Sequence, residues 1–129
     1  KKYDYLKIPL IIKQNEIPLF QKIYDFYKLY YQLIDHLPQK SRVVIGKKIE
    51  YLILKLLQLI SQARFARDQE KIKLLKKTSD NLDFLKTLFR LTYEIKAIDH
   101  EKYFLFEEKL QEMGRILGSW IKDRNNARS

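Results

Sequence analysis

The sequence contains no cysteine, and only three of its 129 residues are glycine and three are proline. Without cysteine, the chain cannot form a disulfide or a thiolate metal site. Because glycine and proline mark most turns, their scarcity predicts few loops and long regular elements. No apolar run reaches the roughly 20 residues that a transmembrane helix needs. We therefore expect no membrane span and, by default, a cytoplasmic protein.

Residues that carry catalytic chemistry are also sparse. The two histidines, His36 and His100, are isolated, and neither belongs to a His-x-x-x-His or Glu-x-x-His metal motif. The sequence has no glycine-rich phosphate loop, and nothing in it groups serine, histidine and aspartate into a nucleophilic site. We predict that the protein is not an enzyme and that it uses no cofactor, metal or small-molecule substrate.

Apolar residues recur with the period of an α-helix over most of the chain, which predicts an all-α fold. We expect helices over about 16–36, 41–66, 69–98 and 100–124, with Asn15, Asp68 and Asp99 as N-caps. Short links between long amphipathic helices favour an up-down-up-down four-helix bundle over residues 17–124. Residues 1–16 lack this period and contain Ile8-Pro9-Leu10-Ile11-Ile12, which predicts an extended arm, and residues 125–129 should fray.

The expected core is the apolar stripe of each helix. The predicted inward positions are Phe20, Ile23, Tyr27, Tyr31 and Ile34; then Ile45, Ile49, Leu52, Leu56, Leu59 and Ala63; then Ile72, Leu75, Leu82, Leu85, Phe89 and Ile95; and last Tyr103, Phe106, Leu110, Met113, Leu117 and Trp120. The many tyrosines and phenylalanines could stack nucleic-acid bases, but at this helical spacing aromatic residues are more often part of the core.

The first helix has more apolar residues than one core-facing stripe needs. The excess consists of Leu19, Phe26, Leu29 and Leu33. A single bundle would leave this surface exposed to water, so we assign these four residues to an interface between copies of the chain.

Positive charge is concentrated in the middle of the sequence. Between Gln39 and Thr78, eleven basic residues face three acidic ones, so eight of the ten net charges fall there. Such a concentration attracts polyanions, and we predict binding of DNA or RNA. The alternative is an ordinary solvated, lysine-rich surface. The predicted contact residues are Arg64, Arg67, Lys71, Lys73, Lys76 and Lys77, together with Arg115, Lys122 and Arg124 near the end of the chain.

The stretch Met113–Lys122 contains two of the three glycines, Gly114 and Gly118, one helical turn apart. A glycine inside a helix costs about 0.5–1 kcal/mol relative to alanine, so a pair of them indicates that another backbone comes close. This could be a crossing within the chain or a contact between subunits. We include Phe104, Gly114 and Gly118 in the predicted interface.

The eight residues Gly114-Arg115-Ile116-Leu117-Gly118-Ser119-Trp120-Ile121 resemble a segment of the accessory variability protein (Avd) of diversity-generating retroelements. The resemblance implies a four-helix bundle that assembles as a pentameric barrel with a basic surface. It also implies binding to nucleic acid and to the element's reverse transcriptase, in support of mutagenic copying of template RNA into cDNA. Residue by residue, it extends to Gly114, Arg115, Leu117, Gly118 and Trp120.

A second family, the bundle proteins of ribosomal-RNA intervening sequences, is the alternative. Its members bind RNA or the ribosome without a polymerase, and their second helix usually carries an Asn-Ile-Ala-Glu-Gly-like segment. The present sequence has Lys47-Lys48-Ile49-Glu50-Tyr51 there, so it is less similar to this family.

Overall fold

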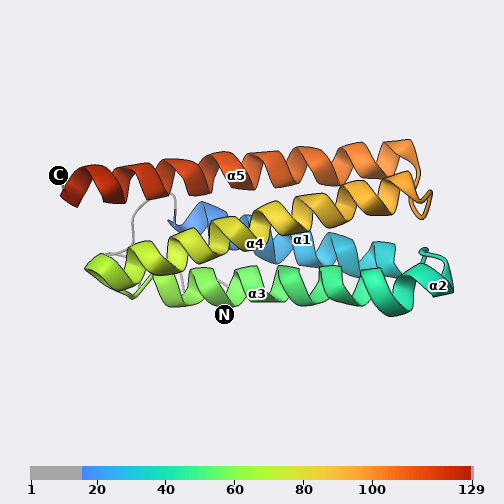
Figure 1. Cartoon of the computed structure of the whole chain (residues 1–129), viewed down its shortest axis with the longest axis horizontal. Coiled ribbons are helices and arrows are strands. Elements are labelled where there is room, and N and C mark those ends of the chain that lie inside the picture. The colour runs from blue at the N-terminus through green and yellow to red at the C-terminus, as the bar shows by residue number, and fades with distance from the viewer. Residues whose placement is uncertain (1–15, 129) are drawn as a thin grey trace.

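The computed structural model describes the backbone of residues 16–128 and the side chains of residues 18–126. Its long helices are α1 (Glu16–Ile34), α3 (Lys47–Ala63), α4 (Asp68–Glu94) and α5 (His100–Arg128). Each runs antiparallel to the next along the chain, and the four lie side by side (Figure 1). The described residues contain no strand, and the predicted all-α fold is confirmed. The expected arm, residues 1–16, lies outside the described residues except for Glu16.

The helix boundaries follow the predicted ones with local differences. The Asp99 carboxylate accepts a hydrogen bond of 2.8 Å from the Lys102 backbone N–H, so Asp99 caps α5 as expected. Asp68, the predicted N-cap of the next helix, is instead the first residue of α4, and Arg67 occupies the N-cap position. At the other end of α4, the helix stops at Glu94, and Lys96 adopts a left-handed φ of 65°. Helix α5 continues to Arg128, past the predicted end at Arg124.

The second predicted helix does not begin as a regular α-helix. A short α2 (Gln39–Ser41) leads into a π-helical turn, η3 (Arg42–Gly46), before α3 starts. The buried Tyr30 hydroxyl donates a 2.6 Å hydrogen bond to the Gly46 carbonyl. A Cβ on Gly46 would lie 3.2 Å from the Leu37 side chain, so glycine lets the two segments approach. The wider π-turn thus joins α1 to α3 at this end of the bundle.

The centre of the core is aromatic. The rings of Phe89 and Phe106 stack at 5.0 Å, and Phe26 meets Phe106 edge-on at 5.3 Å. Tyr30 contacts both Phe89 and Phe106 edge-on. These rings come from α1, α4 and α5, so one cluster joins three of the four helices. The predicted stripe of α5 is confirmed from Phe106 to Trp120, and that of α3 from Ile49 to Ala63.

The buried face of α1 is not the predicted one. Tyr31 is 63% exposed, and Phe20, Tyr27 and Ile34 are half-buried. Ile23 is buried as predicted, but the other core positions of α1 are Leu19, Phe26, Tyr30 and Leu33. Both sets recur at helical spacing. The observed set buries Leu19, Phe26 and Leu33, and it leaves Tyr31 exposed and the Tyr27 hydroxyl free to bond Glu50.

Two predictions are corrected by this burial. Leu19, Phe26 and Leu33 lie in the chain's own core, so they are not available as a surface for another subunit. Ile95, predicted to point inward, is 51% exposed because α4 ends at Glu94, before that turn is completed.

Candidate nucleic-acid interface

The nine predicted nucleic-acid-binding residues fall into different environments. Arg64 directly follows α3 and Lys71 lies in the first turns of α4, and both are buried. Six are exposed and one is half-buried. The exposed ones are Arg67, Lys73, Lys76, Lys77, Arg115 and Lys122, and the half-buried one is Arg124.

Arg64 and Lys71 lie on aromatic rings. The Arg64 guanidinium carbon is 4.8 Å from the centre of the Phe20 ring and 5.6 Å from that of Phe65. The Lys71 Nζ atom is 5.4 Å from the centre of the Trp120 indole. Their exposed fractions are 8% and 6%. The structure therefore corrects their assignment as phosphate contacts: these cations stabilise the packing of aromatic side chains.

Lys73, Lys76 and Lys77 project from α4 into solvent. Among the residues whose side chains are described, none of the three forms an ion pair. Their charges are close together near the N-terminus of a helix, where the helix dipole does not stabilise cations. They are available to an external anion.

A shallow groove of about 230 Å³ lies between α4 and α5, and on α4 it begins at Ser79, one turn after Lys76. It is lined by Ser79, Leu82, Asp83, Lys86, Gln111, Gly114, Arg115, Leu117 and Gly118. The two glycines have different surroundings. A Cβ on Gly114 would lie 3.0 Å from the Lys86 Nζ atom, whereas a Cβ on Gly118 would meet nothing within 4 Å. Gly114 thus leaves room for the Lys86 side chain across α5, and Gly118 leaves the backbone open to solvent.

The groove is bordered by positive charge. Lys86 and Arg115 line it, with Asp83 as the opposing carboxylate. Because α4 and α5 are antiparallel, Lys76 (one turn before Ser79) and Lys122 (one turn after Gly118) lie toward the same end. We call Lys73, Lys76, Lys77, Lys86, Arg115 and Lys122 the α4–α5 basic surface.

Lys86 was missed at the level of sequence. It alternates with Asp83, Arg90 and Glu94 in the pattern of an ordinary solvated helix face. Only the packing of α4 against α5 places it opposite Gly114.

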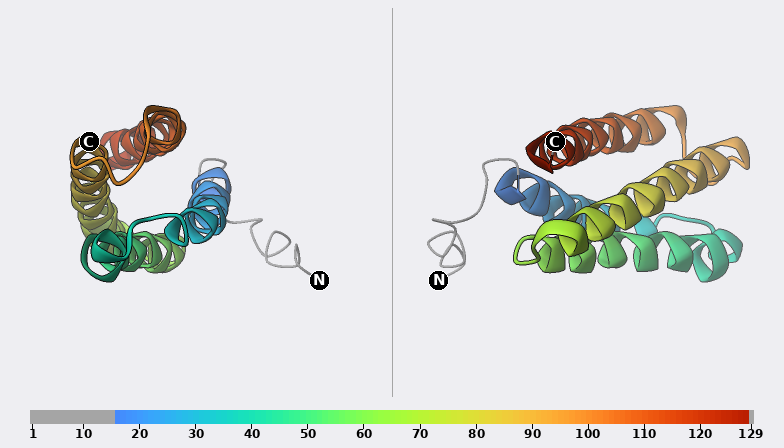
Figure 2. Two further views of the ribbon diagram at one scale, coloured as in Figure 1. Left: turned by 90° about the vertical axis from the view of Figure 1, so that its right-hand side faces the viewer. Right: turned by 60° about the vertical axis from the view of Figure 1, so that its left-hand side comes forward.

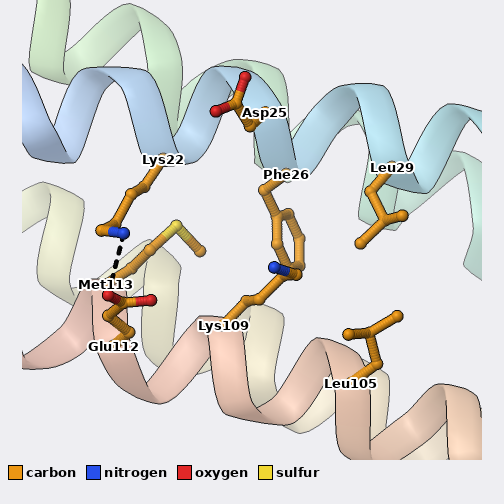
Figure 3. A pocket seen from close by; sticks show the side chains of 8 residues that line it. All are labelled: Lys22, Asp25, Phe26, Leu29, Leu105, Lys109, Glu112 and Met113. Carbon is orange, nitrogen blue, oxygen red and sulfur yellow. Dashed lines mark ion pairs between the residues drawn. The ribbon is translucent and has the colours of Figure 1, made fainter.

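The remaining predicted interface residues, Leu29 and Phe104, do reach the surface. Leu29 and Leu105 face each other at one end of a groove of about 420 Å³ between α1 and α5, which Phe26, Met113 and four charged side chains also line (Figure 3). The Lys22 ammonium and the Glu112 carboxylate pair across its edge at 2.9 Å. This hydrogen bond holds the pKa of Glu112 below its ordinary value. Phe104 is exposed beside His100, with ring centres 4.3 Å apart.

The described residues offer little to a metal. They contain no group of three or more histidine, aspartate or glutamate side chains arranged to hold an ion. Of the histidines, His100 has its Nδ1 atom 2.9 Å from the Tyr93 hydroxyl.

The described helices, within residues 16–128, include no candidate membrane span.

Comparison with known proteins places this geometry in a family. A crystal structure of a protein of unknown function from the S23 ribosomal protein family of Bacteroides thetaiotaomicron is similar, with a TM-score of 0.77 and 19% sequence identity. The alignment covers 84% of the present chain and 99% of the other, and it shows a shared fold. No curated protein matches the sequence. The family model described as bAvd-like matches residues 18–124, which include all four long helices in whole or in large part, and the chain belongs to this accessory-variability-type family.

Proposed function

We propose that the protein is a non-enzymatic accessory factor that binds nucleic acid through the α4–α5 basic surface and acts with the reverse transcriptase of a retroelement. The proposal rests on the exposed cations of α4 and α5 in a bAvd-like chain, together with a groove that Lys86 and Arg115 line with Gly114 and Gly118. In the family that the sequence resembles, such a factor supports mutagenic copying of RNA into cDNA.

The chemistry of the surface suits a phosphate backbone rather than a particular base sequence. Lysine ammonium groups act as point charges that neutralise phosphates and release counterions. Gly118 lets a ligand approach the backbone of α5 more closely than any side chain would permit. Arg115 lies beside this opening and can make two parallel hydrogen bonds to one phosphate. We expect strong salt dependence and weak sequence preference.

We further propose that copies of the chain assemble as a ring, a pentamer by family resemblance. A closed ring uses two different surfaces of each subunit, and the chain has two candidate apolar surfaces. One is the exposed row of Phe84 and Leu91 on α4, with Ile95 directly after the helix; the other is the apolar part of the α1–α5 groove, Leu29 and Leu105. Light scattering at micromolar concentration should return a multiple of 15.7 kDa. A mass of one chain contradicts this part of the proposal.

The binding test compares two triple variants of equal charge change. Lys73→Glu/Lys76→Glu/Lys77→Glu alters the proposed surface, and Lys47→Glu/Lys48→Glu/Lys55→Glu alters α3. Removing one phosphate interaction should make the plot of log K against log salt shallower by about 0.9 on duplex DNA. The first variant should remove several such interactions and the second few or none. Equal changes in both would show that net charge, and not this surface, governs binding.

The partner test uses Arg115→Ala and the reverse transcriptase of the same element. Because Arg115 is exposed, the substitution should leave the free energy of unfolding within about 0.5 kcal/mol of wild type. Retained oligomer mass with weakened capture of nucleic acid or polymerase supports a partner contact. Loss of the oligomer at the same time assigns Arg115 to assembly.

A second function is an RNA-binding bundle protein that works without a polymerase. The fold shared with a protein from the S23 ribosomal protein family favours it as the alternative. Salt-sensitive binding to RNA with no capture of the reverse transcriptase would support this alternative.

A further inference from the structure

A second surface, across α1 and α3, combines exposed aromatic rings with cations. Helices α1 and α3 lie side by side in both views of Figure 2. Tyr24 is 47% exposed, Tyr31 63% and Phe65 57%. None of these rings is needed to fill the core, and none belongs to the α4–α5 basic surface. We call Phe20, Tyr24, Tyr27, Tyr31 and Phe65 the α1–α3 aromatic surface.

The rings of this surface are held in place by contacts within the chain. Phe20 and Tyr24 stack with centres 6.2 Å apart, and Tyr27 and Tyr31 lie 6.3 Å apart. The Tyr27 hydroxyl donates a 2.8 Å hydrogen bond to Glu50 on α3. At the other end, Arg64 lies between the rings of Phe20 and Phe65. The surface is therefore fixed at both ends by bridges from α1 to α3.

Cations accompany these rings. The Lys28 Nζ atom lies 5.6 Å from the centre of the Tyr24 ring, and the buried Arg64 adds positive charge beneath the exposed Phe65. The Glu50 carboxylate also lies at this surface, where it accepts the hydrogen bond from Tyr27. Fixed aromatic faces beside positive charge are the two elements with which proteins bind single-stranded nucleic acid, by base stacking and backbone attraction.

We propose that the α1–α3 aromatic surface binds single-stranded nucleic acid by stacking bases on Tyr24, Tyr31 and Phe65. From Phe20 to Tyr31, α1 rises about 16 Å, which accommodates about four or five stacked bases at roughly 3.4 Å each. The bases of a duplex are already paired and stacked inside it, so this surface discriminates in favour of single strands. The inference rests on the proposed nucleic-acid function and adds a second site with a different ligand preference.

The test measures affinity for a thymidine oligomer of about 12 nucleotides and for a duplex of the same length. Tyr24→Ala/Tyr31→Ala should weaken single-strand binding roughly tenfold or more, since each stacked base contributes about 5- to 150-fold. The slope against salt should not change, because no cation is removed. Tyr24→Phe/Tyr31→Phe keeps both rings and should bind as the wild type does. Val44→Ala, at an exposed position of the η3 turn outside every surface named above, is the control and should change neither affinity.

Photocrosslinking gives a direct readout. An oligomer containing 5-iodouridine should crosslink to the α1 peptide that carries Tyr24 and Tyr31. Single-strand affinity within about twofold of wild type in the double alanine variant, or an equal fall for single strand and duplex, would overturn the inference. A changed oligomer mass in that variant would overturn it too, because the surface would then be a subunit contact. Salt-dependent duplex binding is measured independently, so the proposed function can stand when this inference fails.

Discussion

Arg64 and Lys71 differ from Lys73, Lys76 and Lys77 in their surroundings, although all five lie in one short basic stretch. The first two are buried on the rings of Phe20, Phe65 and Trp120. The other three project into water without ion-pair partners among the described side chains. The buried cations contribute to packing, and the exposed ones contribute to the electrostatic potential outside the protein. A count of basic residues in a stretch therefore overestimates the surface that a polyanion can reach.

The largest loss of stability should come from removing the Trp120 ring, on which Lys71 lies. Trp120 is buried, so Trp120→Ala should lower the free energy of unfolding by about 3–5 kcal/mol through the cavity it creates. The measurement is urea unfolding at equilibrium. Trp120→Phe keeps much of the volume and removes an indole N–H that has no hydrogen-bond partner among the described residues, so it should cost less. A small effect of Trp120→Ala would show that this end of the bundle is loosely packed.

A matched pair of substitutions tests the two groups of cations directly. Lys71→Met removes the cation over Trp120 and should lower stability by about 1–2 kcal/mol. Lys73→Met should change stability by no more than about 0.5 kcal/mol. In nucleic-acid binding the order is reversed. Lys73→Met should reduce the duplex salt slope by about 0.9, because one phosphate is no longer neutralised, and Lys71→Met should leave the slope unchanged. If Lys71→Met and Lys73→Met had equal effects on stability and on the salt slope, buried and exposed cations would not differ in role.

The same contrast between covered and open positions applies to the glycines. Gly118→Ala should stabilise the isolated chain by about 0.5–1 kcal/mol, because the added Cβ meets nothing within 4 Å. Gly114→Ala should gain less, since its Cβ displaces the Lys86 ammonium from a position 3.0 Å away. Thermal unfolding of the two variants gives the comparison. Destabilisation by Gly118→Ala would show that a neighbouring subunit covers this position.

The smallest effect concerns a cation that has a carboxylate partner. Lys22 lowers the pKa of Glu112, so their interaction stabilises the fold above the ordinary glutamate pKa of 4.5 and disappears as the pH falls through the lowered value. Carboxyl NMR should give a Glu112 midpoint below 4.5, and Lys22→Met should raise it. An unchanged midpoint in Lys22→Met would mean that other charges, such as those of Arg115 and Lys109, set the pKa.

Four long helices and the core stripe of α5 could be predicted from the sequence, because helical period is a local property of neighbouring residues. The N-cap at Asp99 was predictable for the same reason, and the hydrogen bond to Lys102 confirms it. The π-turn before α3 was not predictable, since it depends on contacts of Gly46 with Tyr30 and Leu37, which precede it in the chain. On α1, two apolar arcs compete, and local pattern does not rank them.

What the sequence by itself determined is the helical class, the exclusion of disulfides and the excess of positive charge, all of which follow from composition and short-range spacing. Tertiary structure alone decided which arc of α1 is buried, which cations lie on rings, and that Lys86 crosses α5 at Gly114. It also brought Phe20 and Phe65 together around Arg64. The physical reason is that burial and charge exposure depend on the neighbouring helix and its register, and those contacts join residues far apart in the chain.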